Sequence, residues 1–125
     1  MLKVVLLSLL VYSNIETNEN FQNKQKNSFN LKHSYEHKLL LAIKQDDFPT
    51  IENIISNNLI KINEHYEGKT FVIWAAINNK PEIVRLLVNY GADISKRCDL
   101  GFTIEDHCLA NNSIEALSEI VVLKA

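Results

Sequence analysis

The chain has 125 residues, of which 46% are hydrophobic and 22% charged, and a formal net charge of -2. Its length fits one small domain with a leader, and the near-neutral charge without a basic stripe argues against a nucleic acid as partner. The two cysteines are too few for a disulfide framework.

Residues 1–13 have the pattern of a short secretory signal peptide. Lys3 precedes an apolar run that only Ser8 breaks, and small or β-branched residues occupy the positions that a signal peptidase inspects before a cut after Ser13. The run is too short to cross a bilayer, so no stable membrane span is expected. The pattern predicts an exported or secreted protein if the leader functions, and a cytoplasmic one otherwise. The alternatives are a hydrophobic helix packed on the domain and a wrongly assigned start codon.

Residues 14–34 are rich in Asn, Lys, Glu and Gln, with Phe21 and Phe29 as their aromatic residues. No helical or alternating hydrophobic period persists in this segment. Such a composition buries too little apolar surface to offset the entropy lost on ordering, which predicts a disordered polar linker. A short linear motif around the two phenylalanines is the functional alternative.

Residues 35–64 contain a degenerate pair of helical segments. After a shift of about 33 residues, the apolar run at residues 39–43 falls on residues 72–76 of the next stretch. Asn58 falls on Gly91, and asparagine also tolerates the left-handed backbone conformation that ends many helices. The segment lacks the Gly-x-Thr opening of the next stretch, so we predict that it is an N-terminal cap.

Residues 68–94 carry the clearest helix–turn–helix pattern of the chain. Thr70 can cap a first helix, and the polar residues 78–80 interrupt it. Pro81 suits the first position of a second helix, and Gly91 can adopt the conformation that ends it. One face of this second helix is apolar at a period of 3.6 and comprises Ile83, Val84, Leu87 and Val88.

Residues 98–125 repeat this pattern less well. Gly101 and a threonine two positions later follow the Gly-x-Thr opening, and Ser113 is a fair cap for the last helix. Glu119 stands where Leu86 stands one repeat earlier. A charge at this position predicts a face turned to solvent, as a terminal capping repeat requires.

The stretch Gly68–Ile94, with Thr70, two small residues at Ala75-Ala76 and the closing Gly91-Ala92-Asp93, resembles an ankyrin repeat. The resemblance covers residues 35–125 and implies an all-α, ankyrin-type solenoid of about three helix–turn–helix repeats. These are residues 35–64, 65–97 and 98–125, of which the outer two are degenerate and serve as caps.

One departure from the family concerns the start of the first helix. The family usually reads Thr-Pro-Leu-His there, and this chain reads Thr70-Phe71-Val72-Ile73. Because the family's histidine ties neighbouring loops together, its absence implies looser loop packing and modest stability.

The resemblance also implies a non-catalytic, monomeric module that binds another protein through its turn tips and concave helix face. It implies no cofactor and no small-molecule substrate. An apolar patch is expected from Tyr66, Ile77, Leu100 and Phe102, although Leu100 and Phe102 could instead fold back onto the last repeat. The candidate partner-binding residues are Tyr66, Glu67, Lys69, Ile77, Asn78, Arg97, Asp99, Leu100, Phe102 and Asn111.

Three alternatives for individual residues or for the whole chain stay open. The chain could be a structural remnant or a fragment of a longer array, stable only when stacked on more repeats. A metal-dependent enzyme built on His33 and His37 is a weaker alternative, since a site needs three or four convergent ligands. Trp74 could anchor a partner, but large apolar residues at helical spacing usually pack in a core. Cys108 is expected to be a small buried residue.

Overall fold

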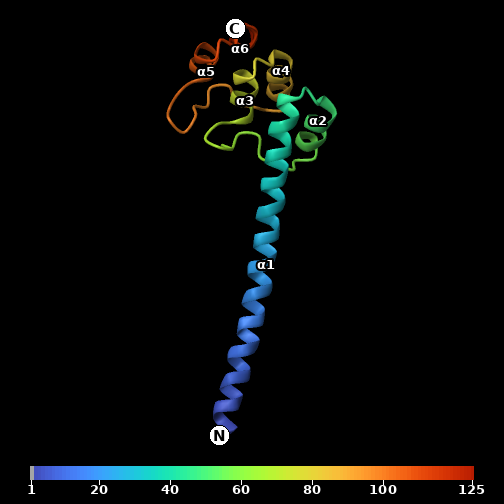
Figure 1. Cartoon of the computed structure of the whole chain (residues 1–125), viewed down its shortest axis with the longest axis vertical. Coiled ribbons are helices and arrows are strands. Elements are labelled where there is room, and N and C mark those ends of the chain that lie inside the picture. The colour runs from blue at the N-terminus through green and yellow to red at the C-terminus, as the bar shows by residue number, and fades with distance from the viewer. Residues whose placement is uncertain (1) are drawn as a thin grey trace. The chain divides into compact units, whose positions relative to one another are not determined.

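The computed structural model describes the backbone of residues 2–125 and the side chains of residues 23–125. Over residues 2–125 the structure is helical, without a β-strand, which confirms the predicted all-α class (Figure 1). The helices are α1 (Leu2–Lys44), α2 (Phe48–Ser56), α3 (Phe71–Ile77), α4 (Pro81–Asn89), α5 (Ile104–Ala110) and α6 (Ile114–Lys124).

The chain forms two units, Met1–Ser34 and Tyr35–Ala125, and α1 contributes to both. In the first unit α1 continues through residues 14–34, where the sequence predicts a disordered linker. Glu, Gln and Lys are good helix formers and no Gly or Pro interrupts the segment, so it can be helical although the side chains of residues 23–30 are exposed.

The predicted signal peptide, residues 1–13, lies outside the residues whose side chains are described. In the part of the chain that the structure describes, no helix combines the length and apolar character needed to span a membrane.

The second unit contains three successive helix–turn–helix repeats, joined internally by the same tight turn. Asp46, Asn79 and Asn112 each have the left-handed backbone conformation, with φ of 56°, 53° and 55°. In each turn the backbone N–H of the residue that follows donates to a carbonyl of the preceding helix. The donor–acceptor pairs are Asp47–Ala42, Lys80–Ala75 and Ser113–Cys108, at 2.9, 3.0 and 2.8 Å. Helix α3 packs on α5, and α4 packs on α6, so that equivalent helices of neighbouring repeats stack.

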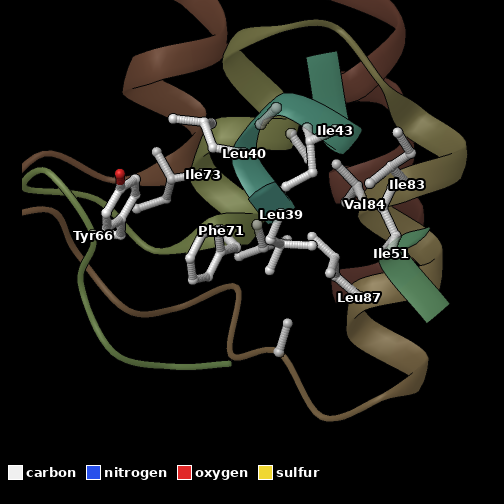
Figure 2. Packing of buried hydrophobic residues seen from close by; sticks show 14 of the residues in the cluster. Leu39, Leu40, Ile43, Ile51, Tyr66, Phe71, Ile73, Ile83, Val84 and Leu87 are labelled. Atoms are coloured by element: carbon white, nitrogen blue, oxygen red, sulfur yellow. The ribbon is translucent and has the colours of Figure 1, made fainter. Parts of the chain in front are cut away.

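A continuous apolar core runs through the three repeats. Figure 2 shows part of it, with labelled side chains from the first two repeats. Cys108 is fully buried in it as predicted, and both cysteines are free thiols. The fully buried side chains include Leu39 and Ile43 at the end of α1, Ile51 of α2, Phe71 and Ile73 of α3, Ile83, Val84 and Leu87 of α4, and Ile104 and Ile120 of the third repeat.

The caps of the helices follow the sequence in α3 and α5 and depart from it in α6. The Thr70 hydroxyl accepts a hydrogen bond from the Ile73 N–H, as predicted, and Thr103 forms a reciprocal capping box with Asp106. The predicted cap by the Ser113 side chain is absent, and its hydroxyl donates to the Ile77 carbonyl at 3.0 Å.

The prediction that Glu119 faces solvent is wrong. Its side chain is largely buried between α4 and α6 and accepts two hydrogen bonds from the Arg85 guanidinium, at 2.7 and 2.9 Å. A paired fork of this kind is the strongest class of charge-assisted hydrogen bond, so a charge at this position is satisfied by the preceding repeat. The apolar residues that α6 does expose are Ile114, Val121 and Val122.

The Arg85–Glu119 pair makes part of the stability sensitive to acid. The hydrogen bond from Arg85, together with its charge, lowers the pKa of Glu119 below the ordinary value of 4.5. A lowered carboxyl pKa stabilises the fold above the unfolded-state value, and this contribution is lost as the pH falls through the folded-state value. Glu119→Gln is therefore expected to lose less stability than the native chain when the pH falls below 4.5. Urea unfolding midpoints at neutral and acidic pH measure this difference, and equal losses in both chains would contradict it.

Candidate functional site

Two neighbouring turns form the tips of the second and third repeats: turn A, residues 63–69, and turn B, residues 97–102. Both contain a glycine in the left-handed region, Gly68 with φ of 85° and Gly101 with φ of 84°, where a side chain would be strained. The Asp99 N–H donates to the Gly68 carbonyl at 2.9 Å and joins the two turns.

A histidine ties these turns together although the family's usual histidine is absent. The Nδ1 atom of His65 is hydrogen-bonded to the Asp99 carboxylate, and Nε2 lies 2.9 Å from the Arg97 carbonyl oxygen. His65 of turn A thus links the two turns from another position, while the looser packing and modest stability implied by the missing histidine stay predictions.

Tyr66 does not belong to an exposed patch, contrary to the prediction. Its side chain is 4% exposed and stacks on Phe71, with the ring centroids 5.8 Å apart, and Figure 2 shows both rings within the core. Burial raises the pKa of the Tyr66 phenol, and the charges of Glu67 and Glu36 add to this. The buried ring therefore stabilises turn A and offers little surface to a partner.

An apolar groove lies between turn B and the outer side of α5. Leu100 and Phe102 of turn B are 83% and 52% exposed, and Leu109 of α5 is 66% exposed. Together with Asp106, His107 and Ala110 they line a groove of about 440 Å³. Leu100 and Phe102 thus do not fold back into the core, and we call this surface the α5 groove.

The wall of the α5 groove contains an unusual histidine. The Phe102 and His107 rings form a T-shaped pair with a centroid distance of 6.2 Å. Within the described residues, His107 Nε2 is buried and has no hydrogen-bond partner. Burial lowers the pKa of His107 and the Lys69 charge adds to this, while Asp106 opposes it. A neutral imidazole keeps the groove uncharged at this point.

Sequence reasoning did not include Asp106, His107 and Leu109 in the surface. A signal for Leu109 was available, because it corresponds to Ala76 one repeat earlier, and Ala76 is fully buried. A large apolar residue at a position that the preceding repeat fills with alanine indicates a different environment. His107 likewise corresponds to Trp74, which is half-buried and packs against the core in the middle repeat.

The remaining candidate positions are either half-buried or exposed. Asn78 and Asn111 use their side-chain amides to donate to the Trp74 and His107 carbonyls of their own helices, each at 2.8 Å. Lys69 places its ammonium 4.7 Å from the centroid of the Trp74 ring. Ile77, Asn78 and Lys69 are half-buried, and the exposed candidates are Glu67, Arg97, Asp99, Leu100, Phe102 and Asn111.

His33 and His37, the pair considered as a metal site, are not among the residues that line the α5 groove. His33 stacks on Phe29 at a centroid distance of 5.9 Å. Among the residues described, no group of three His, Cys, Asp or Glu side chains is arranged to hold a metal ion. His33 and His37 thus have no third ligand there.

Residues 39–123 match the family model described as ankyrin repeats in three copies. The chain belongs to the ankyrin repeat family. Ankyrin repeats are generally protein-interaction modules and typically have no catalytic activity. The three predicted repeats and the all-α solenoid are therefore confirmed.

Similar proteins are found in bacteria and fungi. A protein of Rickettsia bellii named as an ankyrin repeat protein is 33% identical over 89 residues, which is 68% of this chain and 13% of that protein. The palmitoyltransferase akr1 of Schizosaccharomyces pombe is 38% identical over 58 residues, 46% of this chain and 9% of the enzyme. This chain thus spans a small part of the length of these relatives.

The fold is also similar to a chain in a solved complex. That structure contains Bd0816, a predatory endopeptidase from Bdellovibrio bacteriovorus, with the immunity protein Bd3460. The TM-score is 0.62 at 24% identity, over 70% of this chain and 46% of the other. At this identity the similarity shows a shared fold alone.

Proposed function

We propose that this chain is a non-catalytic module that binds another protein through turns A and B and the α5 groove. The observation that carries the proposal is the exposure of Leu100, Phe102 and Leu109 around one groove. Interface cores are enriched in aromatic and other apolar side chains, whereas their rims are polar. Glu67, Arg97 and Asp106 supply exposed charges of both signs on the same turns and helix.

The groove suits a partner that inserts a large apolar side chain. Its lining offers two leucines, a phenylalanine ring and an uncharged His107, with Asp106 as its charged side chain, so an anionic group would lose hydration there without a counter-charge. A few buried apolar or aromatic anchors commonly supply most of the binding energy in such interfaces. The occurrence of this fold in a solved complex of two proteins supports the same class of function.

A pull-down with the full chain tests this proposal. The double variant Leu100→Ser/Phe102→Ser is expected to lose a captured partner by at least about tenfold, because anchor residues typically contribute more than about 1 kcal/mol. Val121→Ser/Val122→Ser is the matched control, since it removes two exposed apolar residues from α6. Circular dichroism verifies that both variants fold. Equal capture by the native chain and the groove variant would contradict the proposed site.

The alternative that the chain is part of a longer array is favoured by one observation. Helix α6 exposes Ile114, Val121 and Val122, an apolar surface of the kind that further repeats cover. We propose a monomer for the main function, whereas this alternative predicts self-association that the Val121→Ser/Val122→Ser variant reduces. Sedimentation equilibrium of both chains distinguishes the two.

Export remains part of the proposal, supported by the leader-like pattern of residues 1–13. Mass spectrometry of the mature N-terminus tests it. Cleavage after Ser13 would support export, and an intact Met1 on the protein in the cytosol would overturn it.

A further inference from the structure

Asp106 places a negative charge in the otherwise apolar lining of the α5 groove. It is exposed in the first turn of α5, and its Oδ2 atom accepts the Thr103 N–H at 2.9 Å. Among the side chains of residues 23–125, the ion pairs involve other acidic residues, which are Asp46, Glu64, Asp99, Glu105 and Glu119. In this part of the chain the Asp106 carboxylate therefore has no ion-pair partner.

The positive side chains nearest to the groove are engaged in other contacts. The Arg97 guanidinium donates to the Gly101 carbonyl at 2.9 Å, and the Lys69 ammonium lies over the Trp74 ring. Neither side chain lines the groove. The hydrogen bonds with Thr103 lower the pKa of Asp106, and the charge of Arg97 adds to this against a small opposing effect of burial. The carboxylate is therefore ionised at neutral pH.

We infer that the α5 groove selects a partner segment in which a large apolar side chain is accompanied by a lysine or arginine, and that Asp106 recognises the basic group. This inference names the chemistry of the partner, so it rests on the proposed function of the same groove. Complementary charges beside an apolar contact fix the register of a partner and exclude partners with the opposite charge.

The lining of the groove suits both parts of such a segment. Leu100 and Leu109 offer exposed aliphatic surface that an apolar side chain can cover. The exposed ring of Phe102 can attract a cation through its π-face, and the carboxylate of Asp106 can pair with it. His107 is uncharged and does not repel a cation. An acidic segment would instead meet the like charge of Asp106, so the groove distinguishes basic from acidic partners.

A selection of random short peptides displayed on phage tests this inference with the full chain as bait. Counter-selection on the Leu100→Ser/Phe102→Ser variant retains those peptides whose binding depends on the groove. We expect them to combine a large apolar residue with a lysine or arginine at a recurring spacing. Groove-dependent peptides without a basic residue would overturn the inference and leave the proposed function intact. A selection without any groove-dependent peptide would contradict the proposed function, and the inference with it.

Asp106→Asn measures the contribution of the carboxylate. Asparagine keeps a side-chain oxygen that can accept the Thr103 N–H, so the cap of α5 is retained, and circular dichroism verifies the fold. Calorimetry is expected to show about threefold to fivefold weaker binding of a selected peptide, as is usual for a partly exposed ion pair. The same peptide with glutamine in place of its basic residue should bind the native chain and this variant equally.

Glu52→Gln is the matched control for the change in net charge. Glu52 is exposed on α2 and does not line the groove, so its replacement should leave the affinity for the selected peptide unchanged. Equal affinity of the native chain and Asp106→Asn would overturn the role of Asp106. The same loss in Asp106→Asn and Glu52→Gln would also overturn it, because the effect would then come from the overall charge of the protein.

Discussion

Phe71→Ala is expected to lower the free energy of unfolding by about 3–5 kcal/mol, the usual cost of removing a buried phenylalanine ring. The Phe71 side chain is 1% exposed, and its ring stacks on Tyr66 in the core of the second unit. Truncation leaves a cavity and frees the Tyr66 ring, which positions turn A. Because small domains are stable by only about 5–15 kcal/mol, much of the chain could unfold at physiological temperature. Urea unfolding followed by circular dichroism measures the loss.

Phe102→Ala is the matched control for this experiment. It removes the same ring from a position that is 52% exposed, so a change within about 1 kcal/mol is expected. A similar loss in both variants would show that Phe102 belongs to the core and would also weaken the proposed groove. A Phe71→Ala chain as stable as the native one would contradict the packing described for the middle repeat.

The middle repeat could be predicted closely because its signals are local. Thr70, Pro81 and Gly91 each act on the backbone of their own helix, and the structure places α3 directly after Thr70 and starts α4 at Pro81. The apolar face of α4 depends only on helical periodicity, and Ile83 and Val84 are buried as that periodicity indicates.

The errors concern residues whose environment is set by contacts outside their own helix or turn. Glu119 resembled a solvent-facing cap residue, but Arg85 of the preceding repeat pairs with it. Tyr66 lies in a turn, where no periodicity distinguishes a buried ring from an exposed one, and Phe71 stacks on it. His65 gave no signal because its partners, Asp99 and the Arg97 backbone, lie in the next turn.

One part of the candidate surface could be predicted from local sequence, and the other part depends on packing between repeats. Leu100 and Phe102 follow from their place at a turn tip, and the structure exposes both. The other wall of the α5 groove comes from Leu109 and His107, whose exposure depends on how α5 packs on α3. A repeat alignment gives the positions of such residues, whereas the degree of exposure requires the stacked structure.

Asn79→Gly is expected to destabilise the chain by about 1–2 kcal/mol through the loss of a cap supplied by a neighbouring repeat. The Asn79 side-chain oxygen accepts from the Ala116 N–H in the first turn of α6 at 3.0 Å, and its amide donates to Glu115 at 2.5 Å. The Ser113 side chain does not cap α6, so Asn79 satisfies this helix end from outside. Glu115 is exposed, so the expected loss rests on the contact with Ala116.

Asn112→Gly separates this cap from the backbone effect of the substitution. Asn112 has φ of 55° against 53° for Asn79, so glycine relieves the same left-handed conformation at both positions. In the described part of the chain, the Asn112 side chain makes no hydrogen bond, and its replacement should change stability by less than about 0.5 kcal/mol. Urea midpoints of both variants give the comparison. If the two lose the same stability, the cross-repeat cap contributes nothing measurable to the coupling between the second and third repeats.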